Sequence, residues 1–93
     1  MARISVLEFA ISDRAESKFW AHGITRRQVI SILENRWIAI ANRKNRAADY
    51  MLIGRDDSGR CIVVPVLPTD VATIWRPVTA WYCKPSEAAR LPY

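Results

Sequence analysis

The spacing of apolar and polar positions changes several times along the chain, and each change predicts an element. Residues 3–9, RISVLEF, place apolar side chains on both faces of an extended chain and predict a first strand. Ser12 then offers an N-cap, and Gly23 can end a helix as a residue that accepts positive φ. Between them, Ala15 and Phe19 recur at helical spacing, so a helix is predicted there.

A second helix has the clearest local signal in the chain. Thr25 and Gln28 fit the capping box, in which each side chain bonds to the backbone of the other residue. Ile24 and Val29 stand where a hydrophobic staple would lie, and Asn35 offers an end. These features predict a helix that begins after Thr25.

A β-hairpin is predicted over residues 49–67. Two apolar runs are separated there by residues 56–59, DDSG, which are turn formers followed by a glycine that accepts positive φ. The second arm, 61–67, is apolar almost without a break, as in a strand near the middle of a sheet. The preceding residues 37–41, WIAIA, predict the strand before the hairpin.

The last part of the chain predicts one strand over 73–82 and a short helix over 86–91. Pro65 and Pro77 cannot donate to a ladder, so each implies an edge, a bulge or an interrupted pairing. The predicted order is β-α-α-β-β-β-β-α, an α+β fold in which two helices pack on a mostly antiparallel sheet. The opposite face of the sheet then needs a partner, the terminal helix or a polar cleft.

The chain length and the cysteine count bound the class of protein. A chain of 93 residues is expected to form a single domain, 1–93, because two cores need more residues. Cys61 and Cys83 are too few for a zinc motif or a disulfide framework, and a lone histidine completes no metal cage. No apolar run approaches the ~20 residues of a membrane span or forms a secretory signal. We therefore expect a cytoplasmic protein that uses no metal or cofactor and contacts no membrane.

The charge balance favours a polyanionic partner. The net charge is +5, and only Lys18, Lys44 and Lys84 among the 14 basic residues are lysines. The remaining eleven basic residues are arginines. Arginine suits bidentate contact with phosphate and stacking on bases. Nucleic acid, an acidic protein and an anionic membrane all fit this balance, and simple solubility is the alternative.

The residue types narrow the candidate chemistry to cationic and aromatic groups. Cleavage of RNA without a metal needs a base, an acid and positive charge around the phosphate. His22 is the residue best suited to proton transfer near neutral pH, and a structural role as the cap of a helix end is the competing interpretation. Arg55 and Arg60 flank the hairpin turn, where solvation alone would explain them. Alternation along the predicted last strand places Arg76 on the same face as Ile74. If that face is buried, the charge of Arg76 needs a partner.

A second set of residues is predicted to contact RNA. The basic loop 42–46 suits backbone contact, with a solvated loop as the alternative. Trp75, Thr79 and Trp81 share one face of the predicted last strand, where base stacking competes with a core or dimer contact. The predicted RNA-binding residues are Arg43, Lys44, Arg46, Tyr50, Thr79, Trp81 and Lys84.

Four short motifs resemble, in order and spacing, the BrnT-type toxins of bacterial toxin–antitoxin systems, within the broader RelE-like fold. The motifs are HGIT at 22–25, YMLIGR at 50–55, GR at 59–60 and IWRPVTA at 74–80. The resemblance spans about residues 20–91, and no motif is specific by itself. The chain departs from the family pattern at Trp81, where the family usually has a basic residue.

The resemblance implies a RelE-like domain that acts as a metal-independent endoribonuclease on messenger RNA. It also implies a cognate antitoxin protein that neutralises the toxin. The toxin would contact operator DNA only through this antitoxin. Carried over residue by residue, the family's polar cluster falls on His22, Arg55, Arg60 and Arg76. A function of a different class stays open, namely a non-catalytic interaction module that binds an antitoxin-like protein or nucleic acid.

Overall fold

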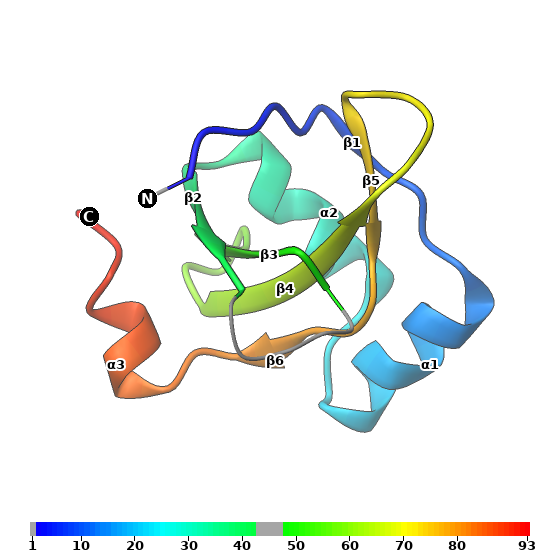
Figure 1. The fold of residues 1–93 in the computed structure, drawn as a ribbon. Helices are drawn as coiled ribbons and strands as arrows, with labels where there is room; N and C mark the ends of the chain where they lie inside the picture. Colours follow the sequence, from blue (N-terminus) through cyan, green and yellow to red (C-terminus); the bar gives the residue numbers. More distant parts are fainter. Residues whose placement is uncertain (1, 43–47) are drawn as a thin grey trace.

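The computed structural model describes residues 2–42 and 48–93 as an α+β domain built on one six-stranded sheet (Figure 1). Within the described residues, the elements in chain order are β1 (Glu8–Phe9), α1 (Asp13–Ala21), α2 (Arg26–Glu34), β2 (Trp37–Ala41), β3 (Tyr50–Arg55), β4 (Cys61–Pro68), β5 (Ile74–Pro77), β6 (Trp81–Tyr82) and α3 (Pro85–Ala88). No helix in these two ranges is long and apolar enough to cross a membrane.

The sheet is mixed but mostly antiparallel. Its strand order is β1-β5-β4-β3-β2, and β6 pairs with β4 beside β5. The β1–β5 pair is parallel, whereas β2–β3, β3–β4, β4–β5 and β4–β6 are antiparallel. The predicted hairpin is confirmed as β3 and β4, and Gly59 in its turn has a φ of 84°. The expectation of a mostly antiparallel sheet is therefore confirmed.

The first two predicted helices are confirmed, because their capping residues form the expected contacts. The Ser12 hydroxyl accepts a hydrogen bond of 3.1 Å from the amide of Ala15 at the start of α1. Gly23, with a φ of 71°, follows the end of that helix. At α2, Thr25 and Gln28 form the reciprocal capping box with bonds of 2.9 and 3.1 Å. Local sequence thus determines where each helix starts.

Two hydrophobic clusters lie on the two faces of the sheet. The larger one packs α1 and α2 on the sheet and includes Phe19, Ile24, Val29, Ile32, Leu52, Ile62, Val64, Val66 and Trp75. The smaller one joins Ile38, Ile53 and Val63 to Leu91 in the C-terminal segment. Figure 1 shows α3 and α1 on opposite sides of the molecule. The terminal helix and the residues after it therefore cover the face that the first two helices leave open.

Two predicted strand boundaries are wrong. The first strand is only Glu8–Phe9, although residues 3–9 were expected to be extended strand. The last strand, expected over 73–82, is divided into β5 and β6, so the order gains a strand. Pro77 ends β5, and the amide of Val78 donates to Pro65 O over 2.9 Å in the same register, but Pro65 has no amide hydrogen with which to return the bond. The pairing with β4 then shifts by one residue before β6.

Pro65 occupies a central strand because the pairing on one side of β4 changes there. β4 pairs with β6 through Ile62 and Val63 and with β5 through Val66 to Pro68. Pro65 falls between these two registers, and it faces Met51 of β3 on the other side. The predicted interrupted pairing is confirmed.

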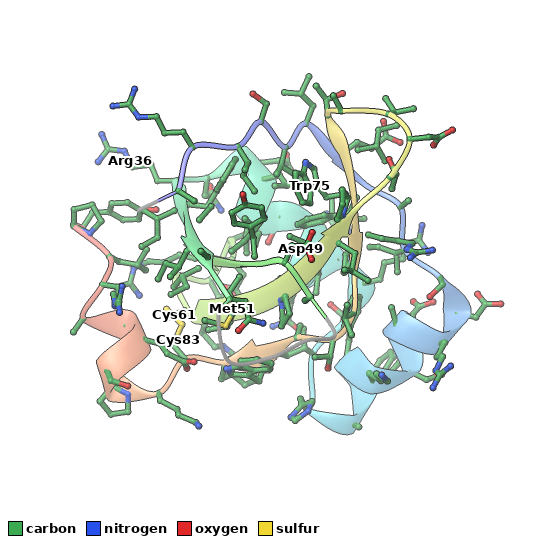
Figure 2. All side chains as sticks on the ribbon, in the orientation of Figure 1. Arg36, Asp49, Met51, Cys61, Trp75 and Cys83 are labelled. Carbon is green, nitrogen blue, oxygen red and sulfur yellow. A yellow bond between two sulfur atoms is a disulfide. The ribbon has the colours of Figure 1, made fainter. Side chains whose placement is uncertain are left out.

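The two cysteines form a disulfide, which was not expected from the sequence. Cys61 begins β4 and Cys83 follows β6, and their Cα atoms are 5.2 Å apart (Figure 2). The amide of Cys83 also donates to Cys61 O over 2.9 Å. The bond thus ties the start of the central strand to the segment that leads into α3.

Candidate functional site

His22 lies at the end of α1 and is exposed. It is the C-cap residue of the helix, and its amide donates to Phe19 O over 2.9 Å. Its neighbour Gly23 turns the chain toward α2 and leaves its own carbonyl free for a partner from outside the helix. The lone histidine therefore stands beside a backbone acceptor at the surface.

Tyr82 of β6 is the hydrogen-bond partner of the Gly23 carbonyl, and it connects Gly23 to Arg60. The Tyr82 hydroxyl donates to Gly23 O over 3.3 Å and accepts a 2.9 Å hydrogen bond from Nη1 of Arg60. The guanidinium carbon of Arg60 also lies 5.3 Å from the centre of the Tyr82 ring. A hydrogen bond and a cation–π contact together hold the arginine in one place.

Gln28 and Asp56 complete this arrangement, which we call the Tyr82 network (Gln28, Asp56, Arg60 and Tyr82). Nε2 of Gln28 donates to Tyr82 Oη over 3.0 Å and to Asp56 Oδ2 over 3.1 Å. Because Gln28 also forms the capping box, the start of α2 is fixed to both β6 and the hairpin turn. The network therefore connects three elements that are far apart in sequence.

Asp56 is the buried charge of the network, with 4% of its surface exposed. Its Oδ1 accepts 2.9 Å hydrogen bonds from the amides of Ser58 and Arg60, which close the turn. Burial acts to raise the pKa of Asp56. The hydrogen bonds from Gln28 and the two amides, together with the Arg60 charge, outweigh burial and lower the pKa below its ordinary value of 3.8. The carboxylate is thus held ionised.

The disulfide flanks the network directly. Cys61 follows Arg60 in the chain, and Cys83 follows Tyr82. The cross-link therefore restrains the two residues whose side chains form the cation–π pair. Neither cysteine was predicted to have a role at the site.

Arg55, which was predicted to join the catalytic cluster, lies at the same end of the hairpin but bonds elsewhere. Its Nη1 donates to Gly59 O over 3.0 Å, and its Nη2 donates to Tyr93 O over 3.2 Å. Arg36 covers the Tyr93 ring at 5.3 Å from its centre. Arg55 therefore joins the turn to the C-terminal residues, away from the hydrogen bonds of the Tyr82 network.

Arg76 stands apart from the other predicted catalytic residues. It pairs with Leu67 near the far end of β4, whereas Arg60 precedes the first residue of that strand. Its side chain is exposed, so burial places no demand on its charge. It lines a hollow of about 320 Å³ with Ser12, Arg14 and Lys18 of the α1 region. We call this hollow, whose other lining residues are Ala15, Leu67, Pro77 and Val78, the basic hollow.

Three residues predicted to bind RNA, Tyr50, Thr79 and Trp81, are half-buried. Trp75, also a stacking candidate, lies in the larger core, where its ring meets Tyr50 edge-on at 5.6 Å and its Nε1 donates to Ser5 O (Figure 2). Trp81 packs on the smaller cluster and donates to the Glu87 carboxylate of α3. The expectation that Trp75 and Trp81 share a face is wrong, because the chain shifts between β5 and β6.

Of the remaining predicted RNA-binding residues, Thr79 and Lys84 form no hydrogen bond with the Tyr82 network, and the others lie outside the described residues. Thr79 is located between β5 and β6, and exposed Lys84 precedes α3. Arg43, Lys44 and Arg46 lie outside the described residues. Among residues 2–42 and 48–93, no group of three or more His, Cys, Asp and Glu side chains could hold a metal ion.

Several members of the network and the hollow were not predicted from the sequence. Gln28 and Asp56 were assigned only local roles, as a capping residue and a turn former, and no local pattern shows that they meet. Arg14 and Lys18 did carry a signal, because Arg14, Lys18 and His22 follow one another at intervals of four and share one side of a helix.

No protein-family description matches the chain, and no curated protein matches it.

Proposed function

We propose that the protein is an endoribonuclease toxin of a toxin–antitoxin pair, with a RelE-like fold and a metal-independent reaction centred on His22 and Arg60. The observation that supports it best is the Tyr82 network. Arg60 is fixed on Tyr82, and Tyr82 bonds to the carbonyl of Gly23, the residue next to the exposed His22. Tyr82 thus links an oriented cation to the residue that follows the histidine suited to proton transfer.

This arrangement suits cleavage of a phosphodiester by the neighbouring ribose hydroxyl. A base removes the proton of the 2′-OH as its oxygen attacks phosphorus, and an acid gives a proton to the departing 5′-oxygen. His22 serves one of these transfers, and the Arg60 guanidinium stabilises charge on the phosphate oxygens. The Tyr82 hydroxyl, already hydrogen-bonded to Arg60, is the candidate for the other transfer.

The test is cleavage of a long RNA by purified protein in excess EDTA. We expect the wild type to cleave and His22→Ala to lose about 10²- to 10⁴-fold in rate, the range of a general acid or base. Arg3→Ala is the matched control, because Arg3 is exposed and lies in another part of the chain. Wild-type protein that leaves RNA intact, or His22→Ala that cleaves at the wild-type rate, would refute the proposal.

A second candidate function is a non-catalytic module that binds an antitoxin-like protein. Two large apolar side chains support it, because Trp20 is 61% exposed and Leu7 is 77% exposed. A folded wild-type protein that binds such a partner and cleaves no RNA would favour this function. A cognate antitoxin is part of both proposals, and contact with operator DNA would occur only through it.

A further inference from the structure

The basic hollow gathers positive charge that the fold itself does not neutralise. Arg14, Lys18 and Arg76 line it, and none of its lining residues is acidic. Within residues 2–42 and 48–93, the side chains of these three cations form no hydrogen bond or ion pair. Asp13 and Glu16 belong to the first turn of α1, but neither lines the hollow. Like charges thus face one cavity without a compensating carboxylate.

We propose that the basic hollow binds a phosphodiester group of an RNA strand that continues along α1 toward His22. The inference rests on the proposed function, since it gives the RNA a path to the reaction centre. Phosphate is the ligand that two guanidinium groups and one ammonium group recognise through charge-assisted hydrogen bonds. The hollow thereby gains the negative charge that its own residues lack.

The elements around the hollow position the cations on two sides. Arg14 and Lys18 are four residues apart on α1 and share one side of the helix, while Arg76 enters from β5. The amides of Asp13 and Arg14, in the first turn of the helix, have no intrahelical acceptor and favour an anion nearby. A single phosphate can therefore meet donors from both elements.

The same side of α1 supplies a path from the hollow to the reaction centre. His22 follows Lys18 by four residues and Arg14 by eight, which corresponds to about 6 and 12 Å along a helix. All three side chains are exposed. A strand held by Arg14 and Arg76 at one end of α1 can thus reach His22 at the other end.

The hollow is suited to reading the RNA backbone and not the bases. No aromatic side chain lines it among the described residues, so it offers no aromatic surface for stacking. Its apolar part consists of Ala15, Leu67, Pro77 and Val78, which carry no side-chain donor or acceptor for a base edge. Contacts made only to phosphate position a strand without selecting its sequence.

The test measures binding of a labelled single-stranded RNA in EDTA over a range of salt concentrations. All proteins carry His22→Ala, so that cleavage does not destroy the probe. We expect Arg14→Ala, Lys18→Ala and Arg76→Ala each to weaken binding. The combined triple variant should also lower the salt slope by about 0.7, because the single phosphate in the hollow is no longer neutralised. Two RNAs of unrelated sequence should lose the same fraction of affinity.

Arg3→Ala in the same background is the matched control, because it removes one exposed positive charge away from the hollow. Hollow variants that keep the control's affinity and salt slope, or a parent protein that binds no RNA, would overturn the inference. So would losses that depend strongly on RNA sequence. Wild-type cleavage is measured in parallel. If the wild type cleaves RNA but the hollow variants have unchanged salt slopes, only the proposed phosphate site is refuted. If the slopes are reduced but the wild type does not cleave RNA, the proposed nuclease activity is refuted and the phosphate site is supported.

Discussion

Arg60 and Arg76 are both exposed arginines beside β4, but their surroundings differ. Arg60 bonds to the Tyr82 hydroxyl and covers its ring, within a network that also holds Gln28 and Asp56. Arg76 faces a hollow with Arg14 and Lys18, and its side chain has no hydrogen-bond partner among the described residues. One cation is oriented before any ligand arrives, and the other is available for one.

The difference suggests two distinct uses of positive charge in one small domain. An oriented cation can stabilise charge that develops in a transition state, because it needs no reorganisation when the reaction occurs. A free cation contributes to affinity, because it exchanges counterions for a phosphate of the ligand. We therefore expect changes in the Tyr82 network to affect folding and rate, and changes in the basic hollow to affect binding.

The largest expected effect on stability comes from the disulfide beside the network. Cys61→Ala combined with Cys83→Ala should lower the free energy of unfolding by about 3 kcal/mol, from the freed loop entropy of the unfolded chain. Urea unfolding with and without reductant measures the loss. Reductant should destabilise the wild type by a similar amount and leave the double variant unchanged. Equal stability of oxidised wild type and double variant would show that the cross-link does not constrain the fold.

That measurement also bears on the predicted cytoplasmic location. A reducing compartment keeps such cysteines as free thiols. In the cytoplasm, the Tyr82 network would therefore have to hold β6 and the hairpin turn together without the cross-link. The salt slope for RNA binding should be the same with and without reductant, because the basic hollow contains neither cysteine. A reductant-dependent slope would mean that the two regions are coupled.

A smaller effect is expected when the Tyr82 hydroxyl is removed. Tyr82→Phe keeps the ring under Arg60 but deprives Gln28, Arg60 and Gly23 of their shared partner. We expect a loss of about 1–2 kcal/mol in unfolding free energy, because half-buried Gln28 and exposed Arg60 and Gly23 all lose a hydrogen bond. Arg76→Ala is the matched variant in the hollow and should change stability by less than about 0.5 kcal/mol. Equal losses in the two variants would remove the distinction between the regions.

The pH dependence of stability should report Asp56. Its pKa is lowered in the folded state, so its stabilising effect is fully present above the unfolded value and is lost as pH falls through the folded value. Asp56→Asn should therefore be less stable than wild type at pH 7. The gap between the two should narrow below about pH 4, as the wild-type carboxylate takes up a proton. Denaturant unfolding at several pH values measures this gap, and a constant gap would contradict the assignment.

Local sequence signals predicted the helices and the hairpin, because each signal is completed by residues close together in the chain. Ser12 caps α1, and Thr25 and Gln28 cap α2, through bonds that span three residues. Gly59 accepts the positive φ of the turn. The pairing of β1 with β5 joins residues 8–9 to 74–75, and no local pattern could predict its parallel direction.

The candidate site was less predictable, because it depends on which distant segments meet. Alternation along a continuous strand placed Trp75 and Trp81 on one face, but the shift after Pro77 separates them. Arg76 was grouped with Arg60 by residue type and resemblance, whereas the sheet register sets them at different ends of β4. The meeting of Gln28 with Tyr82 depends on the docking of α2 beside β6 and carries no signal in the sequence.

The most direct test of two separate uses of charge is steady-state RNA cleavage in EDTA by wild type, Arg60→Gln and Arg76→Gln, after each is shown to be folded. We expect Arg60→Gln to lower kcat by about 10²-fold with little change in KM, as when an interaction made in the transition state is removed. We expect Arg76→Gln to raise KM and to change kcat by less than about twofold. A matched fall in kcat for both variants would contradict this division, since the two arginines would then serve one reaction centre.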